Sequence, residues 1–190
     1  GFDVNVQGGS TLTLSGGTVL NANSIRVNAS TLNENIDLAF PVASDFELSA
    51  ATLNVLNNRT FSIASFDGTN IQSGTVNLPA GSRLDVASNA ITVGNGVTLV
   101  KDGSFGASDQ ISALTVQSGG VVTHSVRLLA GLVLNVTGIV DVQTGGRIDV
   151  TGRGLLGGHH GSAFGANGEA FDAAGTIVAG AGTASSFQGA

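Results

Sequence analysis

The feature that most constrains this chain is a short apolar–polar–apolar unit that restarts after roughly six to ten residues along most of the sequence. Alternation with a period of two places successive side chains on opposite faces of a β-strand. No amphipathic helical spacing is sustained. The chain is therefore predicted to be all-β, with short strands and tight corners. Three copies stand close together, with breaks at Thr137-Gly138 and at Thr144-Gly145-Gly146: Leu132-Val133-Leu134-Asn135-Val136, Val140-Asp141-Val142 and Ile148-Asp149-Val150.

The same unit recurs upstream, and its repetition separates two all-β architectures. A sandwich or barrel joins longer strands by hairpins, whereas a parallel β-solenoid uses three short strands per coil of about 20–25 residues. The short strands and the Gly-Gly corners favour a parallel β-solenoid, a three-sided β-helix. Its hand is predicted to be right, because left-handed forms keep a stricter hexapeptide period. Upstream copies include Ile25-Arg26-Val27, Phe46-Glu47-Leu48, Leu53-Asn54-Val55, Leu84-Asp85-Val86 and Ile91-Thr92-Val93.

The regular alternation of apolar and polar residues ends after Val150, and this change predicts two regions. Residues 1–154 are assigned to the solenoid, and residues 155–190 to an excursion or end segment rich in Gly, Ala and Ser. Within that segment we expect Thr176-Ile177-Val178 to return to the stack. A disordered tail is the alternative, because few apolar residues are available to bury.

Composition excludes several classes of partner and site. The formal charge is −6, and the six Arg and one Lys form no basic patch, which argues against nucleic acid. No run reaches the roughly 18 apolar residues of a membrane span. The absence of Cys rules out disulfides and thiolate metal sites. The chain begins at Gly1 without an initiator Met, which indicates a processed product or an excerpt from a longer polypeptide.

One segment resembles a recurring part of very large bacterial surface proteins. In those proteins a Leu-Thr-His element precedes alternating strands, an "IDVSGxGYxGG" signature and a Gly-rich stretch. Here Val121-Val122-Thr123-His124 precedes the strands, and residues 148–158 read IDVTGRGLLGG, with Thr151 for Ser and Leu155 for Tyr. The match covers residues 121–168, and the rest resembles the broad class of β-helical adhesins and autotransporter-like passengers. The resemblance implies an extracellular parallel β-helix that serves as a stalk, adhesin or matrix fibre, without catalytic residues to carry over.

The histidines are the first candidates for chemistry. His159-His160 lies near Glu169 and Asp172 in sequence, a composition that could suggest a metal site. Neighbouring histidines point in different directions, however, and a Gly-rich setting fixes no ligand geometry, so a solvated loop is the preferred interpretation. For His124 we expect a structural hydrogen bond at a coil corner rather than catalysis.

Carboxylates and hydroxyls are the remaining candidates. Two i, i+2 pairs place an acidic and a basic residue on one strand face: Asp85 with Arg83, and Asp149 with Arg147. Such pairs occur in polysaccharide-cleaving grooves, and they also occur as simple charge partners between coils. Asp141 and Asp149 could hold a cation, although a solvated face is the simpler interpretation. Ice-binding solenoids need regular Thr-x-Thr ranks, and residues 11–13 give the only compact instance.

Asparagines near the expected corners have two possible roles. They either stack into side-chain amide ladders between coils or satisfy local turns, and the turn role is preferred. These residues are Asn28, Asn33, Asn35, Asn57 and Asn58.

Together these features predict a secreted or cell-surface structural protein of bacterial type that is not an enzyme. We expect no catalytic, metal-binding or cofactor-binding residues. The expected partners are other copies of the same protein, joined end to end, and surface glycans. The alternative function is a carbohydrate-binding or polysaccharide-cleaving β-helix.

Overall fold

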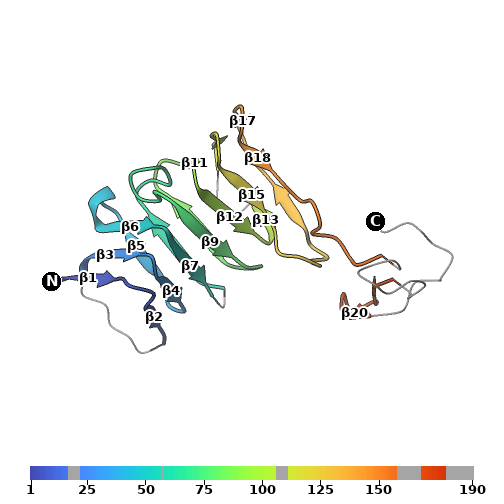
Figure 1. Cartoon of the computed structure of the whole chain (residues 1–190), viewed down its shortest axis with the longest axis horizontal. Coiled ribbons are helices and arrows are strands. Elements are labelled where there is room, and N and C mark those ends of the chain that lie inside the picture. Colours follow the sequence, from blue (N-terminus) through green and yellow to red (C-terminus); the bar gives the residue numbers. More distant parts are fainter. Residues whose placement is uncertain (17–21, 57, 106–110, 158–167, 179–190) are drawn as a thin grey trace.

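The computed structural model describes residues 1–16, 22–56, 58–105, 111–157 and 168–178. It confirms the predicted all-β architecture: parallel sheets stack as a β-solenoid of about six turns. The strands of successive coils lie side by side in Figure 1, from β1 near the N-terminus to β17 and β18 at the opposite end. The right-handed winding stays a prediction.

The longest side of the solenoid is a seven-stranded parallel sheet in the order β18-β15-β12-β9-β7-β4-β2. Equivalent residues on this side are separated by 20, 21 and then 23 residues, which lies within the coil length that the sequence predicts. Its strands are β2 (Thr11–Leu14), β4 (Thr31–Glu34), β7 (Ala51–Val55), β9 (Gly74–Leu78), β12 (Val97–Lys101), β15 (Val121–Thr123) and β18 (Arg147–Ile148).

The other two sides are divided into shorter parallel sheets, so that several coils contain three strands. A 3-10 helix, η1 (Ala43–Asp45), follows the strand that ends at Phe40. The second side contains β1 (Phe2–Val6), β3 (Ala22–Asn28), β6 (Phe46–Ser49), β11 (Ala90–Val93), β14 (Ala113–Val116) and β17 (Ile139–Val142). The third contains β5 (Leu38–Phe40), β8 (Thr60–Ile63), β10 (Arg83–Val86), β13 (Gly103–Phe105) and β16 (Leu132–Leu134).

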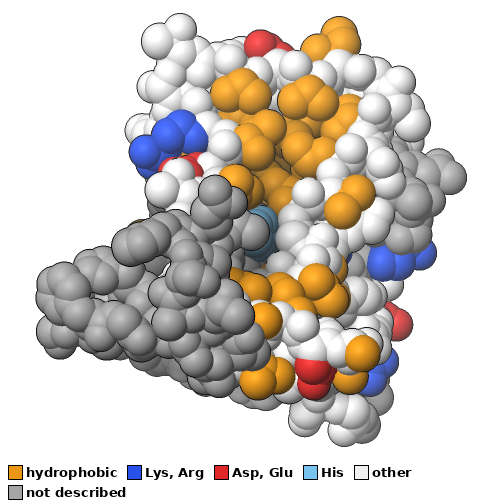
Figure 2. Space-filling model, turned by 90° about the vertical axis from the view of Figure 1, so that its right-hand side faces the viewer, with side chains coloured by type: hydrophobic (Ala, Val, Ile, Leu, Met, Phe, Trp, Pro, Cys, Tyr) orange, Lys and Arg blue, Asp and Glu red, His pale blue; other side chains and the backbone are white. Residues whose placement is uncertain are grey.

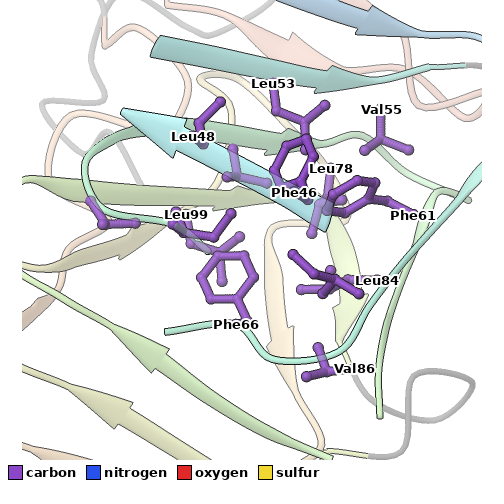
Figure 3. Close-up of a cluster of buried hydrophobic side chains, with 14 of the residues drawn as sticks. Phe46, Leu48, Leu53, Val55, Phe61, Phe66, Leu78, Leu84, Val86 and Leu99 are labelled. Atoms are coloured by element: carbon purple, nitrogen blue, oxygen red, sulfur yellow. The ribbon is translucent and has the colours of Figure 1, made fainter. Parts of the chain in front are cut away.

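The core is a column of inward-pointing apolar side chains, one set from each coil. Strand β7 shows the alternation directly, because Ala51, Leu53 and Val55 are buried and the two residues between them are half-buried. Phe46 and Phe61 pack edge to face with their ring centroids 4.9 Å apart, and Phe40 lies beside both. Figure 3 shows the Phe46 and Phe61 rings among aliphatic side chains of neighbouring coils. Such aromatic contacts add to the stabilisation from area burial.

Glycine is required where one coil passes closely over another. Gly74, at the start of β9, has φ +114°, and a Cβ there would overlap the backbone of Ala51 in the preceding coil. Only a residue without a Cβ tolerates both the backbone conformation and this approach.

The segment after the solenoid forms an antiparallel hairpin, β19 (Ala170–Phe171) with β20 (Ile177–Val178). We expected residues 176–178 to return to the stack, but Ile177 and Val178 pair with β19 and join none of the stacked sheets. The Asp172 carboxylate accepts hydrogen bonds from the backbone N–H groups of Ala174 and Thr176, and these hold the turn.

Candidate functional site

The candidate site is the open end of the solenoid, formed by the last two stacked strands, β17 and β18. Each is the terminal strand of its sheet, so no described strand pairs with its outer edge. On the inner edge, β17 pairs with β14 and β18 pairs with β15. The outer edge therefore presents backbone donors and acceptors in strand geometry, which is the arrangement that templates a further strand.

Inward-pointing aliphatic side chains are exposed at this end. Val140, Val142 and Ile148 are 46%, 45% and 37% exposed. The residues that occupy the same register positions one coil earlier are each 0% exposed, and they are Leu114, Val116 and Val122. The side chains at the end thus continue the core column, but no described coil covers them.

Figure 2 views the molecule from this side, and hydrophobic side chains gather near its centre, whereas the charged side chains in view lie toward its margin. Leu132 and Leu134 of β16 are half-buried and pack against the core, whereas Val150 is exposed. The open end is defined here as Val140, Val142, Ile148 and Val150. Completing the burial of each would contribute on the order of 1 kcal/mol, since full burial of such side chains is worth about 1.5–3 kcal/mol.

Polar groups form the rim of the open end. The Asp149 carboxylate accepts a hydrogen bond from the Thr151 backbone N–H at 2.9 Å, and this contact holds the pKa of Asp149 below its usual value. Gln143 donates to Asp141 at 3.0 Å. These side chains are satisfied within their own turns and leave the apolar centre accessible.

The hairpin is anchored beside the last coil. Glu169 accepts from the backbone N–H of Leu156 at 2.9 Å and lies 3.3 Å from the Arg127 guanidinium nitrogen Nε. The backbone N–H of Arg127 in turn donates to the carbonyl of Arg153 at 2.7 Å. These contacts position the hairpin against a corner.

The structure does not bring Asp85 together with Asp141 or Asp149, because β10 lies on another side of the solenoid and in an earlier coil. Asp85 lies on the outer face of β10, 3.5 Å from the Ser62 hydroxyl, in a depression of about 150 Å³ whose lining contains no second carboxylate. Asp149 and Arg147 lie on the exposed last coil. No group of three metal-ligating side chains occurs among the described residues.

Of the histidines singled out from the sequence, the structure describes His124. The ring of His124 is buried, with Nδ1 2.7 Å from the carbonyl oxygen of Ser125, at the corner where the sequence places a hydrogen bond. His159 and His160 lie outside the described residues, so the candidate metal site that includes them does too. Near His124, Asp102 accepts from the Ser125 N–H at 2.8 Å, and Lys101 donates to two backbone carbonyls.

The asparagines adopt both of the roles considered. Asn58 has φ +59°, a turn conformation that asparagine tolerates. Asn33 instead belongs to an amide ladder with Asn54 and Asn77, on the outer face of the seven-stranded sheet. The sequence suggests a ladder as one role for Asn33, but it does not reveal Asn54 and Asn77 as the partners until the coils are aligned, because the members lie 21 and 23 residues apart.

The fold and its open end define a β-solenoid with an unpaired terminal coil. Searches found no match to this chain among models of protein families, curated proteins or solved structures. In the described part of the chain, no helix has the length and apolar character of a membrane span.

Proposed function

We propose that this chain is an extracellular structural element, a β-solenoid segment of a bacterial surface adhesin, stalk or fibre, that extends by end-to-end association. The observation that carries the proposal is the open end, where Val140, Val142 and Ile148 continue the core column without a covering coil. An assembly contact there would repeat the contact that joins successive coils within the chain.

The opposite end has a compatible form. Strands β1 and β2 are the first strands of their sheets, and Val4 and Leu12 are half-buried members of the same core column. Head-to-tail contact between the two ends is heterologous, so it generates an open filament rather than a closed dimer. Stacked backbone hydrogen bonds spaced about 4.8 Å apart would run through such a filament.

The function is tested by the mass of the protein in solution as a function of concentration, measured by light scattering after size exclusion. The wild-type chain is expected to form species larger than a monomer as concentration rises. The double substitution Val140→Lys and Val142→Lys is expected to keep it monomeric, because unpaired ammonium groups in the contact would lose their hydration.

Ile139→Lys is the matched control. Ile139 lies on the same strand and is 70% exposed, but it has the opposite parity and points away from the column. It is expected to leave assembly unchanged. Circular dichroism of both variants checks that the solenoid is intact. A wild-type chain that stays monomeric at millimolar concentration, or equal loss of assembly in the two variants, would overturn the proposal.

A further inference from the structure

The outer face of the seven-stranded sheet carries two straight ranks of uncharged side chains. The first rank consists of five threonines in mutual register: Thr11, Thr31, Thr52, Thr75 and Thr98. The second rank lies two residues further along each strand and consists of Thr13, Asn33, Asn54, Asn77 and Val100. We call these ten residues the threonine–asparagine face. Its side chains point away from the core, and those of the three middle coils are half-buried.

Hydrogen bonds fix the second rank in place. Asn77 Nδ2 donates to Asn54 Oδ1 at 2.7 Å, Asn54 Nδ2 to Asn33 Oδ1 at 2.8 Å, and Asn33 Nδ2 to the Thr13 hydroxyl at 3.2 Å. The ladder stops at Val100, whose side chain has no donor for the Asn77 carbonyl oxygen. These amides are therefore already ordered, and a partner that meets this face does not have to immobilise them.

The face also differs in charge from the outer surfaces of two other sheets. Sheet β1-β3-β6 carries Arg26 and Glu47 on its outside, and sheet β5-β8-β10 carries Arg83 and Asp85. On the seven-stranded sheet, the first charged outward residue is Arg147 of β18, beyond the threonine–asparagine face. For a chain of net charge −6, this is a surface on which two copies can approach without like charges facing each other.

We propose that the threonine–asparagine face is a lateral interface, on which a second copy of this chain packs face to face. A second copy of this chain has the same spacing between coils along the rod. Each coil of the first copy can therefore lie opposite a coil of the second copy, in constant register. A twofold axis over Thr75 places Thr75 opposite Thr75 and Thr52 opposite Thr98. Paired sheets whose polar ladders interdigitate form dry, closely packed interfaces of this kind. Lateral pairing is distinct from end-to-end growth and would convert single rods into pairs.

The absence of native cysteine makes crosslinking a direct test. Thr75→Cys places a single thiol at the centre of the face, and a short bismaleimide with a reach of about 10 Å matches the spacing of packed sheets. Ser62→Cys is the control, because Ser62 is also half-buried and points outward from β8 on another side. The expected result is a covalent dimer yield at least several-fold higher for Thr75→Cys. Equal yields would overturn the proposal.

Two further variants separate this interface from the open end. Adding Thr52→Lys to Thr75→Cys is expected to reduce the yield to the control level, whereas Thr60→Lys, on the outside of β8, is expected to leave it unchanged. The crosslink is also expected to persist when Val140→Lys and Val142→Lys block end-to-end contact. Loss of the crosslink in that background would show that the face does not pair by itself, and the proposal would fail while end-to-end growth stood.

Discussion

Replacement of Glu34 by Gln is predicted to remove most of a pH-dependent loss of stability. Glu34 ends β4 in register with Leu14 and Val55, both of which are buried in the core column, and Glu34 itself is 0% exposed. Neither carboxyl oxygen has a hydrogen-bond partner. Burial raises the pKa of Glu34 to about 9, and the negative charge of Asp37 raises it as well. The Leu38 backbone N–H lies nearby and lowers this pKa, but its geometry is not that of a hydrogen bond.

The direction of the pH effect follows from these values. Because the folded pKa of Glu34 lies above its unfolded value of 4.5, the folded state holds the proton more tightly. The associated stability is complete below pH 4.5 and is lost as the pH rises toward 9. Each pH unit within that window costs about 1.4 kcal/mol, so the loss between pH 5 and pH 8 is about 4 kcal/mol.

Urea denaturation at pH 5, 6, 7 and 8 measures this loss. The free energy of unfolding of the wild type should fall relative to that of Glu34→Gln by about 4 kcal/mol across the series, because Gln does not titrate. Glu47→Gln is the control, since Glu47 is partly exposed on the outer face of β6 and its 3.8 Å ion pair with Arg26 is worth little. Parallel pH profiles for the wild type and Glu34→Gln would refute the reasoning.

Three further substitutions test the packing of the coils, each by urea denaturation at constant pH. Gly74→Ala is expected to lower the free energy of unfolding by at least about 3 kcal/mol, because the added Cβ would overlap the preceding coil. Gly96→Ala should lower it by about 1 kcal/mol, since the added Cβ there causes only backbone strain. Similar losses for the two variants would contradict the close approach at Gly74. Asn54→Ala is expected to lower the free energy of unfolding by about 1–2 kcal/mol, because it breaks two hydrogen bonds of the amide ladder. Thr52→Ala on the same strand should lower it by only a few tenths of a kcal/mol. Equal losses would exclude a stabilising ladder. Phe61→Ala is expected to cost about 3–5 kcal/mol, and a cost below 1 kcal/mol would contradict its central position in the core.

The sequence predicts the solenoid well because its signal is local. Alternation within three to five residues decides which side chains point inward, as the burial of Leu53 and Val55 around Asn54 shows. The same parity places Glu34 with Leu32 on the inner face of β4, so the buried carboxylate could have been found by following the alternation past the apolar residues.

Relations between coils are much harder to predict. The five threonines of the first rank align only once each coil length is known, and those lengths vary because the corners differ. The sequence therefore shows one Thr-x-Thr pair at residues 11–13 and conceals the rest of the rank. Similarly, the stretch from Leu132 to Val150 has the clearest strand pattern, but nothing local indicates that it forms the exposed last coils.

Electron cryomicroscopy of the concentrated protein tests the central claim most directly, that coils stack in parallel and that the open end accepts a further coil. We expect unbranched rods in which density layers about 4.8 Å apart repeat along the rod axis. Single short particles at every concentration, or strands that run along the axis instead of across it, would contradict the claim.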